Sequence, residues 1–508
     1  RKPPGTVRYN KATVTLSGAD SIIAAPPVDS RNTRVDRNAV LTPKEWGVIL
    51  PFRWVEIEGW QGELLPKQII RRAVYSSSWD DDAAAFECSD EMLNRIWELC
   101  KWSIKATTFA GVYVDGDRER IPYEADAYLN QLSHYYTDND IQMARDTYDY
   151  LMQHPTWPTE WASHMIFMAH ADWMHTGDAE WLRPRYKALE SKLLLDRVKD
   201  SLVHSNDKQI KRDDIVDWPK GERDGFVFTE VNTVVNAFYI RSLFMMGDLA
   251  DALELASDAS KWRQMATDAQ VEFQAKLFDH DAGRYNDGIS TNHQSAHANF
   301  FPLALDLVPE EQCPAITDWL VEREMSCSVY AAQYLLEALF ENGASQAALD
   351  LMTAPTDRSW RHMVESGATI TWEAWDMKYK SNQDWNHAWG AAPANLLPRY
   401  VLGAEALTPG WQTARIRPQP SGLSFAKGKV PTPHGPILIE WEQGDAFTLS
   451  LDIPPQIQLQ LELPVIEGGT SVLQDGRPTP AKRVGNRWIL NPSVQGKSIF
   501  VVESDPKE

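Results

Sequence analysis

Helical periodicity dominates the middle of this sequence and constrains its fold more than any other feature. Apolar residues recur at helical spacing in about a dozen stretches between positions 89 and 402, separated by short breaks with Gly, Asp or Pro. Many helices joined by short links are typical of nested antiparallel pairs. A closed ring of six such pairs, an (α/α)6 barrel, would bury these two-sided helices. A solenoid stays open as an alternative, although no fixed-period repeat supports it.

Short β-rich runs flank the helical region on both sides. Residues 1–84 alternate such runs, as in 13–16, 54–57 and 68–70, with Pro and Gly. Strand patterns return after residue 408. We therefore predict a multidomain chain with an N-terminal β-sandwich, whole or partial, over residues 1–84, an (α/α)6 barrel over residues 85–407 and a C-terminal β-sandwich over residues 408–508.

The net charge of the chain limits the kinds of molecule that it is expected to bind. Lys and Arg number 50 and Asp and Glu 71, which gives a net charge of −21. Such a surplus repels phosphate backbones and anionic lipid surfaces, so we expect neither nucleic acid nor a membrane as a partner. We also expect no membrane anchor, because no stretch of about 18 apolar residues occurs. The sequence indicates no oligomeric state. A periplasmic or secreted location fits if an N-terminal segment has been removed, and a cytoplasmic one otherwise.

Tryptophan is enriched, with 21 residues in the chain. This is roughly three times an ordinary share. Two interpretations are open. Indole rings fill large helical cores, and they also form platforms for sugars, because the flat indole face covers the C–H face of a pyranose.

The densest group of acids lies in the segment Val114–Asp126. It has five carboxylates between Asp115 and Asp126, and Gly116 and Pro122 interrupt it. Such breaks are incompatible with one continuous helix, so we predict a loop that enters a helix. Loops on a rigid scaffold commonly carry catalytic residues, but a solvated cluster of ion pairs has the same composition.

Two further segments combine acids with tryptophan. The second acidic segment is Gly367–Asp376, followed by the run Asp384–Gly390. In it, Glu373 lies between Trp372 and Trp375; apolar walls raise a carboxyl pKa and offer stacking faces for a sugar. A helix start with Glu373 exposed fits this pattern equally well. The segment Asp213–Pro219 again places acids beside Trp218.

Two acidic segments in a large helical ring suit glycoside hydrolysis, which needs two carboxylates flanking one bond. The sequence has none of the common motifs for nucleotide phosphates, dinucleotides, zinc proteolysis or the serine elbow. The run Asp279-His280-Asp281 departs from the spacing of a calcium loop. We therefore expect a carbohydrate substrate, no cofactor and no metal site.

Taken as a set, the motifs resemble those of the family 78 glycoside hydrolases, the α-L-rhamnosidases. The resemblance covers most of residues 50–420. It rests on Arg118-Glu119-Arg120, on Trp372-Glu373-Ala374-Trp375-Asp376 and on the run 386–391. It implies an (α/α)6 catalytic domain and an inverting hydrolase that releases terminal α-L-rhamnose, or a closely related sugar, from an oligosaccharide, polysaccharide or glycoside.

The resemblance also implies roles for individual residues. Glu119 would be the general acid that protonates the leaving oxygen, and Glu373 the general base that activates water. The residues implied to bind the sugar are Asp115, Arg118, Tyr123, Asp126, Trp218, Trp375 and His387. The extra acids Asp117 and Glu124, and a tyrosine at position 123 where the family has tryptophan, depart from the family pattern and bear on which sugar is bound.

The arginines beside Glu119 conflict with an acid role, because a nearby guanidinium lowers a carboxyl pKa. We expect Asp115, Asp117 and Asp126 to pair with Arg118 and Arg120, so that Glu119 faces the cleft. If the pKa order of Glu119 and Glu373 is the reverse, their roles are exchanged.

Two other classes of protein remain open. A polysaccharide lyase could use Tyr123 or His387 as its base and Arg118 to neutralise a uronate. A non-catalytic carbohydrate-binding protein would keep the tryptophans without needing both glutamates.

Overall fold

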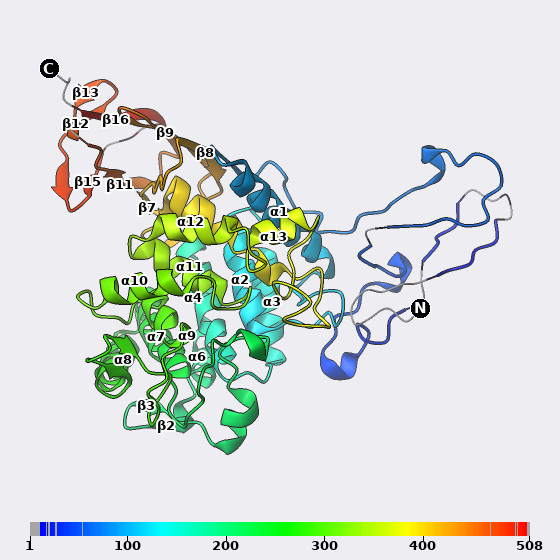
Figure 1. Cartoon of the computed structure of the whole chain (residues 1–508), viewed down its shortest axis with the longest axis horizontal. Coiled ribbons are helices and arrows are strands. Elements are labelled where there is room, and N and C mark those ends of the chain that lie inside the picture. The colour runs from blue at the N-terminus through cyan, green and yellow to red at the C-terminus, as the bar shows by residue number, and fades with distance from the viewer. Residues whose placement is uncertain are drawn as a thin grey trace.

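The structure, a computed structural model, describes residues 11–16, 18, 21–25, 28–52, 54–467, 469–492, 494 and 496–504. Helices form its centre, β-sheets lie against one side, and the N-terminal segment extends from the other (Figure 1). The ends of the two predicted β-domains, residues 1–10 and 505–508, lie outside the described residues.

The α-helices lie within the predicted region between positions 89 and 402. The first helix is capped by Asp90, whose side chain accepts the N–H groups of Met92 and Leu93. The α-helices of the described residues are α1 (Glu91–Thr107), α2 (Glu124–Tyr135), α3 (Gln142–Gln153), α4 (His164–Thr176), α5 (Ala179–Leu182), α6 (Tyr186–Leu189), α7 (Thr233–Ala252), α8 (Ala256–Leu277), α9 (His297–Ala304), α10 (Cys313–Arg323), α11 (Ala332–Glu341), α12 (Ser345–Thr353), α13 (Trp360–Glu365) and α14 (Pro393–Leu396). Within these residues, no helix is both long and apolar enough to cross a bilayer.

The helices close into a ring. Contacts run from α1 to α2, α4, α7, α9, α11 and α12 in turn, and α12 packs against α1 again. The outer helix α8 packs on α7, and α3 packs on α4. This closed path confirms the predicted barrel and excludes the solenoid, whose end units would not meet.

The β-strands are concentrated after the barrel. They are β1 (Ala85–Cys88), β2 (Val198–Lys199), β3 (Leu202–Val203), β4 (Phe278–Asp279), β5 (Arg284–Tyr285), β6 (Ala404–Ala406), β7 (Thr413–Ile416), β8 (Phe425–Val430), β9 (Ile437–Gln443), β10 (Phe447–Ile453), β11 (Gln458–Pro464), β12 (Gly469–Gln474), β13 (Arg477–Pro478), β14 (Lys482–Val484), β15 (Arg487–Leu490) and β16 (Gly496–Ser504).

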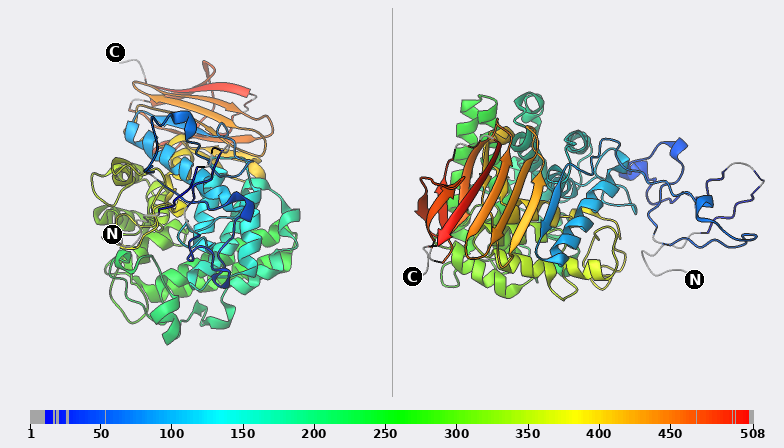
Figure 2. Two further views of the ribbon diagram at one scale, coloured as in Figure 1. Left: turned by 90° about the vertical axis from the view of Figure 1, so that its right-hand side faces the viewer. Right: turned by 90° about the horizontal axis from the view of Figure 1, so that it is seen from above.

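Two larger sheets form the C-terminal domain. One has seven strands in the order β1-β8-β9-β10-β16-β12-β13, and the other has five in the order β14-β15-β11-β7-β6. Burial alternates along β9 and β10, as expected for strands with one face in a core. The strand β1, which precedes the barrel, pairs antiparallel with β8 and lies at the edge of this sheet (Figure 2).

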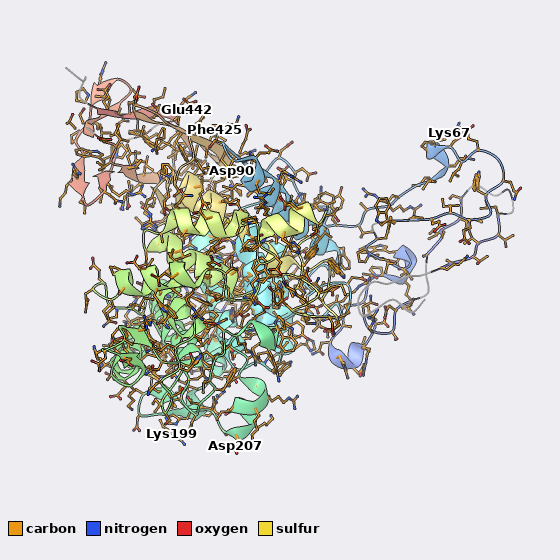
Figure 3. The ribbon with its side chains drawn as sticks, viewed as in Figure 1. Lys67, Asp90, Lys199, Asp207, Phe425 and Glu442 are labelled. Atoms are coloured by element: carbon orange, nitrogen blue, oxygen red, sulfur yellow. The ribbon has the colours of Figure 1, made fainter. Side chains whose placement is uncertain are left out.

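The strands predicted in the N-terminal segment do not form in the described residues. Three short 3-10 helices, η1 (Val35–Arg37), η2 (Lys44–Trp46) and η3 (Pro66–Gln68), interrupt an otherwise irregular chain that extends to Lys67, far from the helices (Figure 3). The β-rich runs 13–16 and 54–57 are irregular. A strand requires a partner that accepts its hydrogen bonds, and within the described residues none pairs with these runs.

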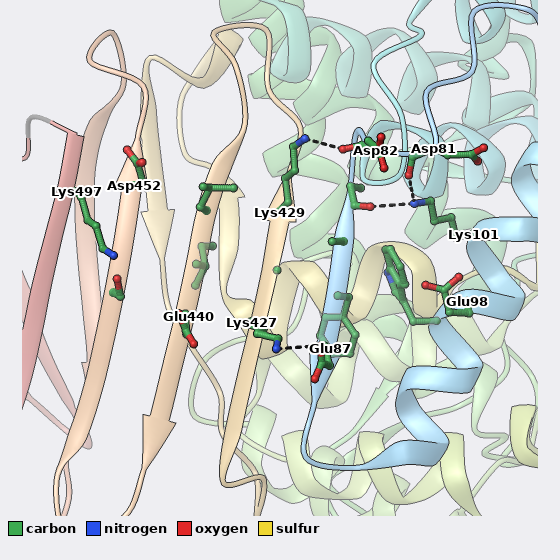
Figure 4. A pocket seen from close by; sticks show the side chains of 18 residues that line it. Asp81, Asp82, Glu87, Glu98, Lys101, Lys427, Lys429, Glu440, Asp452 and Lys497 are labelled. Carbon is green, nitrogen blue, oxygen red and sulfur yellow. Dashed lines mark hydrogen bonds and ion pairs between the residues drawn. The ribbon is translucent and has the colours of Figure 1, made fainter.

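A groove of about 610 Å³ separates α1 from the outer face of the seven-stranded sheet (Figure 4). Three of its lysines have partners: Lys101 donates to Ala84 O at 2.9 Å, Lys427 pairs with Glu87 at 3.0 Å, and Lys429 donates to Asp82 O at 2.6 Å. Its lining includes none of the candidate site residues. The groove is therefore a junction between barrel and sheet and is not part of the candidate site.

Ion pairs join the barrel to the five-stranded sheet. Arg399 lies at the C-terminal end of the barrel and contacts Glu337 of α11 at 2.6 Å and Glu405 of β6 at 2.8 Å. Arg415 of β7 also pairs with Glu405. Burial alone would raise the pKa of Glu405, but Arg399 and Arg415 outweigh it and hold that pKa at about 2.

Replacing Glu405 tests this junction. We expect Glu405→Gln to lower the free energy of unfolding at neutral pH by about 3 kcal/mol, because two arginines lose their shared partner. Since the pKa of Glu405 is depressed on folding, its contribution is present above the unfolded value of about 4.3 and is lost as the pH falls toward 2. Denaturant unfolding at several pH values, with Glu442→Gln on the exposed face of β9 as control, measures this. An equal effect at pH 7 and pH 3 would contradict it.

Candidate active site

The first acidic segment is a loop whose two ends are joined by hydrogen bonds of Asp115. Asp115 Oδ1 accepts the N–H groups of Gly116 at 2.8 Å and Ile121 at 2.9 Å, and Asp115 N donates to Ile121 O at 2.8 Å. The helix α2 then begins at Glu124. The predicted loop entering a helix is confirmed.

The loop lies directly against the second acidic segment. Arg118 N donates to Asp384 Oδ2 at 3.0 Å, and Asp117 N donates to Asn386 Oδ1 at 3.4 Å. A Cβ atom at Gly116 would lie 2.7 Å from Asp384 Oδ2 and 2.8 Å from Asn386 O. Gly116 is therefore needed for this close approach.

Arg118 joins the two predicted catalytic glutamates. Its Nη1 lies 3.1 Å from Glu373 Oε2 and its Nε lies 3.6 Å from Glu119 Oε1. The two nitrogens belong to one rigid guanidinium, so these carboxylate oxygens lie no more than about 9 Å apart. The side chains differ in exposure, with 39% for Glu119 and 4% for Glu373.

Glu373 is a buried carboxylate surrounded by donors. Lys380 Nζ lies 3.1 Å from Oε1, and Asp384 N donates to Oε2 at 2.7 Å. Burial alone would raise the pKa of Glu373, as the sequence suggested, but His387, Arg118 and Lys380 outweigh burial and hold that pKa below its ordinary value. Glu373 is therefore ionised near neutral pH, which suits a base.

A second pair of carboxylates lies beside these groups. Asp126 Oδ1 is 2.6 Å from His387 Nε2. Burial raises the pKa of Asp126 despite His387, and burial together with Asp384, Glu119 and Asp126 raises the pKa of Asp115 well above its ordinary value. The site thus contains a carboxyl group with a lowered pKa, that of Glu373, beside two with a raised pKa, those of Asp115 and Asp126. Acid–base catalysis requires carboxyl groups whose pKa values differ in this way.

Tyr123 and Trp218 lie at the border of this cluster. Tyr123 is half-buried with its ring 5.7 Å from that of Trp161, and burial followed by Asp115 and Glu119 raises its pKa. Trp218 is also half-buried, and Lys380 Nζ lies 5.9 Å from its ring centre. Both rings keep some exposed surface for a ligand.

The prediction that Trp375 binds the sugar is wrong in this structure. Its side chain has no exposed surface, its ring packs edge-on against Trp360 at 5.0 Å, and its N–H donates to Cys327 O at 2.8 Å. An indole whose faces and N–H group are all engaged is part of the core. Trp372 is likewise buried.

The arginines are paired only partly as expected. Arg120 pairs with Asp117 at 2.6 Å, as predicted, but Arg118 contacts Glu373 rather than Asp115 or Asp126. Of the two extra acids, Asp117 thus faces Arg120, and the buried Glu124 accepts the N–H of Thr156 at 2.8 Å. Both are engaged by the protein.

Sequence reasoning missed two members of the site. Lys380 lies in a polar turn, where a lysine normally indicates a solvated surface, and no local pattern predicts its contact with Glu373. Asp384 stands beside Trp385 in the second segment, and the same association of acids with tryptophan could have singled it out.

Comparison with known proteins identifies the family of this chain. The model of the bacterial α-L-rhamnosidase 6 hairpin glycosidase domain matches residues 81–401, well over half of the chain. The chain belongs to the bacterial α-L-rhamnosidase family. The model of that family's C-terminal domain matches residues 403–477. The resemblance inferred from the motifs is thereby confirmed.

Individual α-L-rhamnosidases match this chain at low sequence identity but over most of its length. An α-L-rhamnosidase of Alteromonas sp. (strain LOR) is 24% identical over 456 residues, covering 81% of this chain and 48% of the relative. The solved α-L-rhamnosidase of Dictyoglumus thermophilum superposes with a TM-score of 0.73 at 19% identity over 83% of this chain and 50% of the other. That of Streptomyces avermitilis, complexed with L-rhamnose, gives 0.70 at 18% identity over 84% and 42%. These structures share the fold, an α/α barrel with flanking β-domains. The chain spans about half the length of the relatives it matches.

A substitution at Gly116 tests the contact between the two acidic segments. We expect Gly116→Ala to lower the free energy of unfolding by about 1–3 kcal/mol, because the added methyl group overlaps Asp384 and Asn386. Gly221→Ala is the matched control, since a Cβ there meets nothing within 4 Å. Thermal unfolding of both variants measures the difference, and equal stability would show that the segments are not in close contact.

Proposed function

We propose that this chain acts as an inverting glycoside hydrolase that releases terminal α-L-rhamnose, or a closely related sugar, from an oligosaccharide, polysaccharide or glycoside. The observation that carries the proposal is the contact of Glu119 and Glu373 with one guanidinium, that of Arg118. It brings oxygens of two carboxyl groups from distant segments within about 9 Å, so both can flank one glycosidic bond, and inversion is what the resemblance to the family implies. Membership of the α-L-rhamnosidase family supports the choice of sugar.

Glu373 acts as the general base in this proposal. Arg118 and Lys380 favour its ionised form, so it can accept a proton from water on one face of the sugar. Glu119 acts as the general acid, since its exposed side chain can reach the leaving oxygen on the opposite side. The water then attacks the anomeric carbon in a single displacement while Glu119 protonates the departing group. The exchanged assignment disagrees with the lowered pKa of Glu373.

Other residues at the site would bind the sugar. The raised pKa of Asp115 favours its protonated form, which can donate to a hydroxyl group as well as accept from one. The Asp126–His387 pair offers a second set of polar atoms, and the half-exposed ring of Trp218 offers a flat face.

The structure gives less support to the alternatives. A lyase needs a base that loses its proton readily, but burial and neighbouring carboxylates raise the pKa of Tyr123. His387 is already paired with Asp126 at 2.6 Å. A non-catalytic binding protein has no need of a buried, ionised Glu373 opposite a second glutamate.

The sugar and the stereochemistry are tested together. We expect wild-type enzyme to hydrolyse an aryl α-L-rhamnoside faster than the corresponding α-L-fucoside, α-L-arabinoside or β-D-glucuronide. Proton NMR of fresh hydrolysate should show first the β anomer of rhamnose, because one displacement inverts the anomeric carbon. Initial release of the α anomer would disprove inversion. Unsaturated products that absorb in the ultraviolet would indicate the lyase instead.

Substitution of the two glutamates tests their roles. We expect Glu373→Ala and Glu119→Gln each to lower kcat by at least about 10²-fold without loss of folded protein, because positioned acid–base catalysis contributes about 10²–10⁴-fold. The Glu119 variant must be assayed with a poor leaving group, since a good one departs without protonation. Glu365→Gln, at an exposed glutamate of α13, is the control. Wild-type turnover in Glu373→Ala would remove that residue from the mechanism.

A further inference from the structure

The loop with Glu119 is held on a second side by the N-terminal segment 29–49. Asn32 Nδ2 donates to Asp117 O at 2.8 Å, and Val40 N donates to Arg120 O at 2.9 Å. The two acceptors are the backbone carbonyls on either side of the dipeptide Arg118-Glu119. The segment therefore forms hydrogen bonds with the loop on both sides of the dipeptide that contains the proposed acid.

The contact of Asn32 with the loop is buried. Asn32 is 4% exposed. Arg120 Nη2 donates to Ile49 O at 2.6 Å and to Asp117 Oδ1 at 2.6 Å, so one guanidinium links the segment to the loop. Buried polar groups cost free energy unless they are paired, so this arrangement favours one position of the loop.

The segment is itself attached to the barrel. Tyr150 of α3 donates its hydroxyl to Asn38 O at 3.0 Å, and the neighbouring Ala39 is buried. Segment 29–49 forms no strand, but it contacts both the helical ring and the loop and therefore fixes the position of the loop relative to the ring. It is part of the support of the site.

Glu119 depends on such support more than Glu373 does. The carboxylate of Glu373 is held by Arg118, Lys380 and a backbone N–H group. The Glu119 side chain is 39% exposed, and its ion pair with Arg118 is long, at 3.6 Å. The direction of Glu119 is thus set mainly by the backbone of its loop.

We propose that Asn32 is a positioning residue for the general acid: through Asp117 O it keeps the loop where Glu119 reaches the leaving oxygen. This inference rests on the proposed function and assigns a catalytic contribution to the N-terminal segment. Small displacements of a catalytic group are costly, since about 1 Å can reduce the rate by about 10²-fold. Asn32 touches no substrate in this scheme and acts only through the loop.

The dependence of rate on the leaving group tests the proposal. A good leaving group, as in 2,4-dinitrophenyl α-L-rhamnoside, departs without an acid, whereas methyl α-L-rhamnoside requires one. We expect Asn32→Ala to lower kcat/KM for the methyl glycoside at least about tenfold more than for the dinitrophenyl glycoside. Glu119→Gln should change the same ratio more strongly. Asn32→Gln, which keeps an amide donor, should restore part of the loss.

The ratio of the two rates also provides the controls. It does not depend on the fraction of folded enzyme, so it stays informative if Asn32→Ala is less stable. Thr33→Val removes a hydrogen bond within the segment, from Thr33 Oγ1 to Asp29 O, and should leave the ratio unchanged. Equal losses on both substrates, or no loss on either, would overturn the positioning role. A wild-type enzyme inert toward both rhamnosides would instead overturn the proposed function, and this inference with it.

Discussion

The ion pair between Arg118 and Glu373 is the interaction on which the site depends. It joins residues 255 positions apart, at opposite ends of the helical region, so it forms only when the ring of helices is closed. The same contact stabilises the charge of a buried carboxylate, which would be costly without a partner. The ionised form of the proposed base is therefore stabilised only when the ring of helices has closed. The helices contribute to the chemistry chiefly by bringing two irregular loops together.

Much of the fold could be predicted because helical and strand periodicity are local properties of a sequence. Apolar spacing predicted that helices fill the region between positions 89 and 402, and the ring follows from their number and short links. Pairing between distant segments has no local signal, so nothing in residues 85–88 indicates that this strand joins a sheet whose other members follow residue 424. The strands predicted in the N-terminal runs do not form, for the same reason. High β-propensity is a preference for a pleated surface, and it forms no strand without a neighbour.

The candidate site could be predicted at the level of segments better than of residues. A run of acids that Gly116 and Pro122 interrupt is hard to place in a helix, so the loop was identifiable, and the family motif supplied the glutamates. Which way a side chain points is a tertiary property: Trp375 faces the core although it stands two positions from Glu373. Lys380 lies in a turn like many others and belongs to the site only because that turn folds back over Glu373.

Strand β1 makes the barrel an insertion into the β-domain. The chain enters through one strand of a sheet, builds the whole ring, and returns through β6 and β7 of the other sheet to β8, the neighbour of β1; Ser424 N donates to Ser89 Oγ across 335 positions. Such high contact order slows folding, because a long loop must close before the pairing contributes. During synthesis the sheet cannot acquire its edge strand until the ring is complete and residues beyond it have emerged. Cleavage of the chain between the barrel and β6 would leave β1, which stays attached to the barrel, hydrogen-bonded to β8 of the sheet.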